Sequence, residues 1–152
     1  MNETVIALLN DARARELHAI SQYMVQHYEW DDTGYGRLAA SIKQIAIQEM
    51  KHAEHLAERI LFLRGTPTTK HSDSAKKGLG IAAHLNVDIA LEADAVKMYN
   101  DSARVCAEEL DNISKALFEE LLADEELHLD EFKRTLDHVE KLGDAYVATL
   151  ID

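Results

Sequence analysis

Residues 49–52 read Glu49-Met50-Lys51-His52, and residues 125–128 read Glu125-Glu126-Leu127-His128. They are the only two Glu-x-x-His sequences in the chain, and they lie 76 positions apart (49 to 125), which is half of its 152 residues. The same offset relates two further pairs of identical residues, Glu16 with Glu92 and Tyr23 with Tyr99. The two halves of the chain therefore look like copies of one unit, and a pseudo-twofold axis would bring equivalent residues face to face.

The repeated unit is a helical hairpin, because apolar residues recur every three or four positions along four long segments. We expect helices over residues 4–30, 37–63, 82–110 and 112–142. Asp31 to Gly36 has the composition of a turn, and Asp111-Asn112 marks a brief break that offers an N-cap for the fourth helix. We expect a short fifth helix within residues 144–152. The pattern predicts an all-α protein.

The connections between the helices set the topology. Helices one and two, and helices three and four, are joined by short links, so the members of each pair should be antiparallel neighbours. The link from Gly65 to Ile81 is long and polar. About seventeen extended residues can span about 55 Å, whereas a helix of about 27 residues is only about 40 Å long. We therefore expect a four-helix bundle with one long crossover, the ferritin-like arrangement, rather than an up-down-up-down bundle.

Composition argues against several classes of protein. The net charge is −12 with histidine counted neutral, which argues against a nucleic-acid binder, since that function requires a basic face. No apolar run is long enough to span a membrane, and Met1-Asn2-Glu3-Thr4 does not resemble the start of a secretory signal. Cys106 is the only cysteine, which fits a reducing cytoplasm and a buried structural role. The length suits a single domain over residues 1–152.

Each of the four repeated glutamates stands where a core residue is expected. One stripe of the second helix reads Ile42, Ile45, Glu49, His52, Leu56 and Ile60, and one stripe of the fourth reads Phe118, Leu121, Glu125, His128, Phe132 and Leu136. Burying four carboxylates together is very costly unless their charge is compensated, and two divalent cations would supply the missing positive charge. Oxygen and imidazole ligands suit iron or manganese better than copper. The residues therefore predict a dinuclear metal site between the helices.

These motifs resemble the bacterioferritin family over nearly the whole chain. The stretch EMKHAEHLAERILFLRG (residues 49–65) is similar to that family's second-helix signature, and residues 16–23, 88–92 and 124–128 resemble its other three motifs. The resemblance implies a cytoplasmic iron-storage protein, a hollow shell of twenty-four identical subunits. Each subunit would be a ferroxidase that oxidises Fe(II) with dioxygen or hydrogen peroxide before the ferric mineral is stored. We expect the apolar residues of the tail to lie at contacts between subunits, because the four-helix core does not need them: Tyr146, Val147, Leu150 and Ile151.

The resemblance also implies the roles of individual residues at a centre of two iron ions per subunit. Glu16, Glu49 and His52 would hold one iron, Glu92, Glu125 and His128 would hold the other, and Glu49 and Glu125 would bridge both. Tyr23 closes one of the matching motifs and is a further catalytic candidate. From the residues alone, Tyr23 and Tyr99 are more typical of core aromatics than of redox partners.

A haem of b type, shared by two subunits through one methionine from each, is a further implication of the resemblance. Met50 stands at the matching position. It follows Glu49 directly, so it points about 100° away from the metal ligands, toward a face with Ala46, Ile47 and Ala57. From composition alone, Met50 would more often be interface packing than a ligand. An electron-donor protein such as a ferredoxin is an expected partner.

Two features depart from the family pattern, and other functions stay open. Gln44 and Gln48 stand where some relatives have a His and an Asp that bind an extra iron on the inner shell surface, and Tyr99 is not expected there. The main alternative is a non-storage di-iron or di-manganese oxidoreductase of the same fold, either peroxidase-like or catalase-like. A single cysteine excludes the paired-cysteine module of rubrerythrins. Miniferritins lack the paired Glu-x-x-His, and the repeat argues against a partner-binding bundle with incidental carboxylates.

Overall fold

The computed structural model of the chain describes residues 2–152. Its elements, in order, are α1 (Glu3–Asp32), α2 (Gly36–Phe62), α3 (Ile81–Glu108), α4 (Asn112–Leu142), α5 (Asp144–Val147) and the 3₁₀ helix η1 (Ala148–Leu150). Within residues 2–152 there is no strand. In the same range no helix combines the length and the apolar character that crossing a membrane requires. The predicted all-α fold with a short fifth helix is confirmed.

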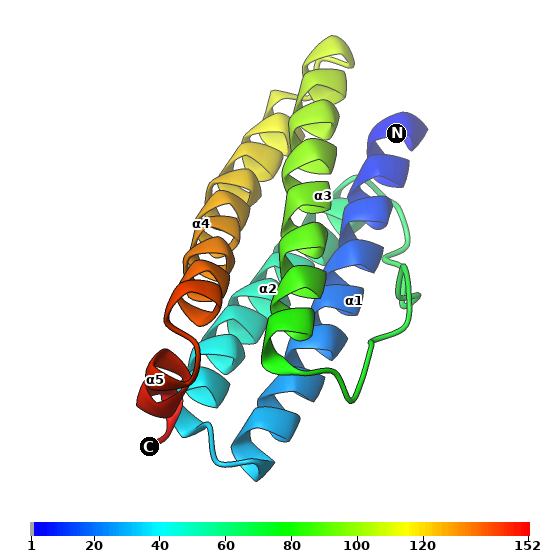
Figure 1. Cartoon of the computed structure of the whole chain (residues 1–152). Coiled ribbons are helices and arrows are strands. Elements are labelled where there is room, and N and C mark those ends of the chain that lie inside the picture. The colour runs from blue at the N-terminus through cyan, green and yellow to red at the C-terminus, as the bar shows by residue number, and fades with distance from the viewer. Residues whose placement is uncertain (1) are drawn as a thin grey trace.

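The four long helices form a bundle of two hairpins, α1 with α2 and α3 with α4 (Figure 1). The segment between α2 and α3 runs along the outside of the bundle beside α1, as the long crossover requires. The backbone N–H of Ser72 donates to the carbonyl of Ala14 (3.0 Å), and that of Lys76 donates to the Gln22 side chain (2.7 Å). These bonds hold the crossover against α1. Because the crossover returns the chain to the end of the bundle where α2 began, α2 and α3 run in the same direction.

Two helix ends differ from the prediction by two residues, and the others differ by one residue or not at all. Asp31 and Asp32, expected in a turn, continue α1, and the chain reverses after Thr33 at Gly34, which has a φ of +92°. The third helix ends at Glu108 because Leu110 adopts a φ of +60° and leaves the helix. Differences of this size are usual at helix ends, where the last turn frays.

A layer of buried polar side chains divides the apolar core into two clusters. One cluster includes Val5, Leu9, Leu56, Tyr99 and Phe118. The other includes Tyr23, Ile42, Leu85, Phe132 and Leu136. Four fully buried glutamates lie between the two clusters, one on each long helix: Glu16, Glu49, Glu92 and Glu125. Apolar packing on both sides therefore holds the four helices in register around the polar layer.

The C-terminal segment folds back onto the bundle. Leu150 packs against the cluster that contains Ile42 and Leu85, and the Tyr146 ring lies 5.1 Å from the ring of His138. The expectation that the bundle core does not use the tail is therefore wrong for Leu150. Ile151 stays half exposed.

Asp111 ties the start of α4 to the end of α2. Its carboxylate accepts hydrogen bonds from the Ser114 backbone N–H (2.9 Å) and hydroxyl (2.7 Å), which makes it the predicted N-cap. The Arg59 guanidinium of α2 donates to the same carboxylate at 2.8 Å. Although burial by itself would raise the pKa of Asp111, these hydrogen bonds hold it below its ordinary value.

We predict that Asp111→Ala lowers the free energy of unfolding of the metal-free protein by about 1–2 kcal/mol, because it removes both the cap and the ion pair. Asp111→Asn should lose less, since its side-chain oxygen still accepts from Ser114. Urea denaturation measures the difference. Asp101→Ala is the matched control, because the Asp101 side chain is about half exposed and forms ion pairs with the exposed side chains of Lys97 and Arg104. It should change stability by less than about 0.5 kcal/mol. Equal midpoints for the two alanine variants would show that the cap contributes nothing.

Candidate metal centre

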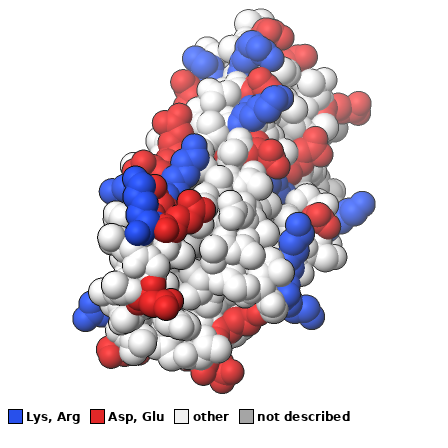
Figure 2. Space-filling model, in the orientation of Figure 1, with Lys and Arg blue, Asp and Glu red and all other residues white. Residues whose placement is uncertain are grey.

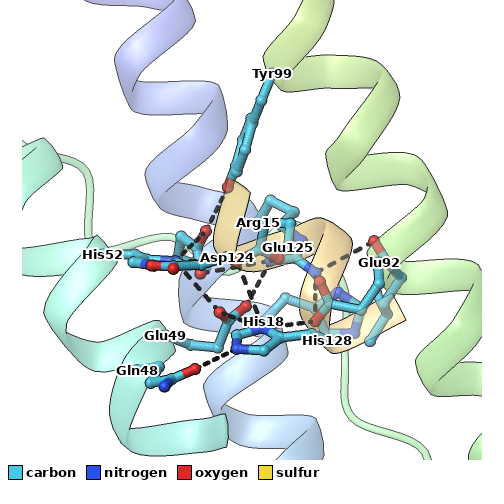
Figure 3. A network of polar contacts seen from close by, with 12 residues as sticks. Arg15, His18, Gln48, Glu49, His52, Glu92, Tyr99, Asp124, Glu125 and His128 are labelled. Atoms are coloured by element: carbon cyan, nitrogen blue, oxygen red, sulfur yellow. Dashed lines mark hydrogen bonds and ion pairs between the residues drawn. The ribbon is translucent and has the colours of Figure 1, made fainter. Parts of the chain in front are cut away.

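Six side chains from all four long helices meet in the polar layer between the two apolar clusters (Figure 3). They are Glu16 of α1, Glu49 and His52 of α2, Glu92 of α3, and Glu125 and His128 of α4. Ligand-type atoms of Glu16, Glu49, His52 and Glu125 lie within 4.8 Å of one another, and so do those of Glu49, Glu92, Glu125 and His128. Because Glu49 and Glu125 belong to both groups, they are placed to bridge two cations. The structure thus brings together all six residues that the sequence singled out.

Each of these six side chains has one buried polar atom that finds no hydrogen-bond partner within the described part of the chain. The atoms are Oε2 of Glu16, Oε1 of Glu49, Nδ1 of His52, Oε2 of Glu92, Oε1 of Glu125 and Nδ1 of His128. A buried polar atom without a partner costs about 1–3 kcal/mol, and more where the group is charged. Six such atoms in one layer fit a pair of cations, and four carboxylates with two imidazoles are a donor set that suits iron or manganese.

The guanidinium of Arg15 lies inside the same layer. Its Nη1 is 2.6 Å from Oε2 of Glu49, 2.8 Å from Oε2 of Glu125 and 3.4 Å from Oε2 of Glu16. Its Nη2 is 3.2 Å from Oε1 of Glu92. Arg15 is only 3% exposed. This single arginine contacts all four buried carboxylates. Sequence reasoning missed it, although its spacing from Ala19 and Gln22 places it on the core stripe of α1.

Two tyrosines link the halves of the centre in a crossed arrangement. The Tyr23 hydroxyl of α1 donates to Glu92 of α3, and the Tyr99 hydroxyl of α3 donates to Glu16 of α1. The equivalence predicted from the 76-residue offset is therefore present in the fold. Burial and the neighbouring carboxylates raise the pKa of both tyrosines well above the ordinary value, so both hydroxyls stay protonated and donate.

The outer ring nitrogens of the two histidines are also held. Nε2 of His52 lies 2.8 Å from Oδ2 of Asp124, and Nε2 of His128 contacts the side-chain oxygen of Gln48. Each Nδ1 then faces the carboxylates, so it is the atom available to a metal. Partners of this kind orient a ligating imidazole. Gln48, considered from the sequence only as a poor ligand for an extra iron, has this second role here.

The charges in the layer are strongly coupled. Burial and Glu49 raise the pKa of Glu16 to about 7, and burial with the neighbouring glutamates raises that of Glu125 well above its ordinary value. Burial alone would raise the pKa of Glu49 as well, but Arg15 and the two histidines hold it low. Burial would lower the pKa of His128, yet Glu49 and Glu92 raise it to about 9. The metal-free centre therefore carries protons at neutral pH.

Met50 lies outside this centre, on the exposed side of α2. It is 41% exposed, and the half-buried Ile47 and Ala57 lie on the same side of the helix. Ala46, which was expected on this face, is fully buried in the core instead. The thioether of Met50 is therefore not needed by the packing of its own subunit.

We predict that loading the centre with Zn²⁺ releases protons near neutral pH, because metal ligation requires neutral imidazoles and ionised carboxylates. Metal affinity should rise with pH above about 7, as Glu16 and then His128 lose their protons, and it should continue to rise because the pKa values of His52 and Glu125 are raised as well. Calorimetry in buffers of different ionisation enthalpy measures the release. A binding heat that does not depend on the buffer at pH 7 would contradict the clustering of these groups.

Sequence comparison matches residues 6–142 to the ferritin-like domain family. The bacterioferritin of Desulfovibrio desulfuricans is 43% identical over 146 residues, which cover 96% of this chain and 82% of that protein. The bacterioferritin of Brucella melitensis is 39% identical over 140 residues, covering 92% and 87%.

Two solved structures agree with these sequence matches. The X-ray structure of the Desulfovibrio desulfuricans bacterioferritin, which describes its diiron site in different catalytic states, superposes with a TM-score of 0.96 at 42% identity, over 97% of this chain and 86% of that one. The Mycobacterium tuberculosis bacterioferritin BfrA also gives a TM-score of 0.96, at 33% identity, over 100% and 96%. With the matching fold and the buried carboxylate and histidine cluster, these likenesses show that the chain belongs to the bacterioferritin family.

Proposed function

We propose that this chain is the subunit of an iron-storage protein, and that it oxidises Fe(II) at the centre formed by Glu16, Glu49, His52, Glu92, Glu125 and His128. The observation that carries the proposal is the set of six buried donor atoms that make no hydrogen bond within the described residues and lie close together in one layer. Two cations would satisfy them, with Glu49 and Glu125 shared between both ions. Fe(II) is the substrate in this scheme, and the helices supply its ligands.

The proposed reaction removes one electron from each of two Fe(II) ions. With hydrogen peroxide as oxidant, the two electrons and two protons give two molecules of water; with dioxygen, they give one molecule of hydrogen peroxide. The two ions must be held together so that both electrons reach one oxidant molecule. Shared carboxylates hold them in this way, and the Tyr23 and Tyr99 hydroxyls fix the orientation of Glu92 and Glu16. We therefore assign Tyr23 the role of a positioning residue that acts through Glu92.

We also propose that one b-type haem would be held between two subunits by the thioether sulfur of Met50 from each. The fit rests on a methionine that its own subunit does not bury, on the side of α2 that faces away from the centre. Thioether ligation favours ferrous haem and a raised reduction potential. Such a haem would pass electrons from a donor protein, such as a ferredoxin, toward the stored mineral.

Storage requires that the ferric product be enclosed, and we propose a closed cytoplasmic shell of twenty-four subunits built from dimers. On the face shown in Figure 2, charged side chains gather toward the ends and edges, and a broad uncharged area covers the lower half of α3. Surfaces depleted of charge suit contacts between subunits. A non-storage oxidoreductase of the same fold would need no such enclosure.

We predict that the assembled protein binds two Fe(II) per subunit and oxidises them rapidly, and that replacing Glu16 and His128 together by Ala abolishes the fast phase. Each substitution removes a ligand from one of the two equivalent sets. Stopped-flow absorbance of ferric iron measures the rate. The matched control is the double variant Glu126→Ala, His138→Ala, which changes the same residue types at exposed positions of α4.

Size exclusion with iron analysis separates storage from the oxidoreductase alternative. Storage requires ferric iron to co-elute with a particle far larger than the 17.1 kDa chain. If the double variant of Glu16 and His128 oxidises Fe(II) at the parent rate, these residues do not form the oxidation site and the assignment of the centre is wrong. Full oxidation by a monomer or dimer that retains no iron would favour the oxidoreductase.

A fourth prediction concerns Met50. Met50→Leu keeps the size and helix propensity of the residue but removes the sulfur. When both proteins are supplied with haem, the variant should therefore lack the spectrum of sulfur-ligated haem that the parent shows. Visible absorption of the ferrous form reports this. Met24→Leu is the control, because Met24 is partly buried against the apolar core. A Met50→Leu variant with the parent's haem spectrum would show that Met50 is not the ligand.

A further inference from the structure

Arg15 and a pair of bridged cations compete for the same carboxylate oxygens. Nη1 of Arg15 takes Oε2 of both Glu49 and Glu125, at 2.6 Å and 2.8 Å. These are the two carboxylates that belong to both ligand groups. A carboxylate that bridges two cations through its two oxygens needs both of them free. With the guanidinium in place, each bridging candidate has only Oε1 to offer.

Charge gives a second reason why the guanidinium and two cations exclude each other. In the metal-free layer, Arg15 supplies part of the positive charge that offsets the repulsion among four fully buried glutamates. Two divalent cations match the charge of four carboxylates by themselves. A guanidinium left among them would then be a buried charge without a counter-charge, and such a charge is very costly.

The fold offers the guanidinium another position close by. A cavity of about 130 Å³ opens between α1, α3 and the crossover, and its lining includes His18, Gln22, Leu91, Asp73 and Asp94. Arg15 lies three and seven positions before His18 and Gln22, so all three share one face of α1. Its Nη2 already donates to the Leu91 carbonyl at 3.2 Å. Asp73 and Asp94 are exposed, so a guanidinium turned toward them would be paired and hydrated.

We propose that Arg15 is an internal counter-cation of the metal-free centre, and that it turns out toward the cavity beside Asp94 when two divalent cations bind. This inference rests on the proposed metal centre and adds the residue that sets its affinity. The guanidinium must leave Glu49 and Glu125 before these carboxylates can bridge both cations. Its ion pairs are lost in that step, so Arg15 weakens metal binding. A centre of this kind releases its cations readily, which suits a site through which iron passes on its way to the store.

Titration of the assembled metal-free protein with Co²⁺ tests the proposal, since the visible absorption of Co²⁺ reports binding to oxygen and nitrogen ligands. We expect Arg15→Met to bind Co²⁺ roughly tenfold more tightly than the parent, or tighter still. Arg15→Lys keeps the charge and should stay close to the parent. Without metal, Arg15→Met should unfold at a lower temperature than the parent, and saturation with Co²⁺ should remove that difference.

Arg59→Met is the matched control. Arg59, like Arg15, forms an ion pair, with Asp111 at 2.8 Å, but it is only partly buried and lies at the end of the bundle. Its loss should lower stability with and without Co²⁺ and leave the Co²⁺ affinity unchanged. A general effect of removing a buried arginine is thereby separated from competition within the centre.

Crystal structures of the parent protein without metal and with Co²⁺ decide the question even if Arg15→Met does not fold. We expect the guanidinium among the four carboxylates in the first structure and beside Asp94 in the second. An Arg15→Met affinity no tighter than that of the parent overturns the proposal, as does a Co²⁺-loaded structure in which Arg15 still contacts Glu49 and Glu125. If neither the parent nor Arg15→Met binds Co²⁺ at the centre, the proposed metal centre itself is wrong.

Discussion

Glu16, Glu49, Glu92 and Glu125 lie fully buried in one layer of the bundle, where the repulsion between their carboxylates must be offset by nearby positive charge. The other groups of the layer all act on this repulsion. Arg15 contacts the four carboxylates, His52 and His128 are held protonated by them, and the raised pKa of Glu125 keeps one proton among them. A centre stabilised by protons and a guanidinium is ready to exchange these charges for divalent cations.

Such a layer is tolerated because apolar packing surrounds it on both sides. The clusters around Phe118 and Phe132 hold the four helices together above and below the glutamates. The tyrosines add a connection between halves, since Tyr23 and Tyr99 each belong to an apolar cluster and bond a carboxylate of the opposite hairpin. The positions of the candidate ligands are therefore fixed by packed helices, and little reorganisation of the backbone is needed when a cation binds.

The helical periodicity of the sequence was sufficient to predict the arrangement of the four helices. Helical spacing placed each Glu on the core face of its helix, and the 76-residue offset showed that two hairpins would present equivalent ligands to each other. Because a 3.6-residue repeat determines which side of a helix a residue occupies, the six ligand candidates could be named without coordinates. The length of the link between α2 and α3 settled the crossover, since a short link could not have reached the far end of the bundle.

Periodicity along one helix does not predict which residues of another helix a side chain will contact. The contacts between side chains of different helices were therefore known only from the tertiary structure. Arg15 is an arginine on a core stripe in the sequence. Only the packing of α1 against the other three long helices places its guanidinium between Glu49 of α2 and Glu125 of α4 and against the Leu91 carbonyl of α3. The crossed tyrosine bonds and the support of His128 by Gln48 arise in the same way. The sequence by itself determined the fold and the six candidate ligands, because both follow from spacing along helices, whereas the counter-charge inside the centre was decided by which helices became neighbours.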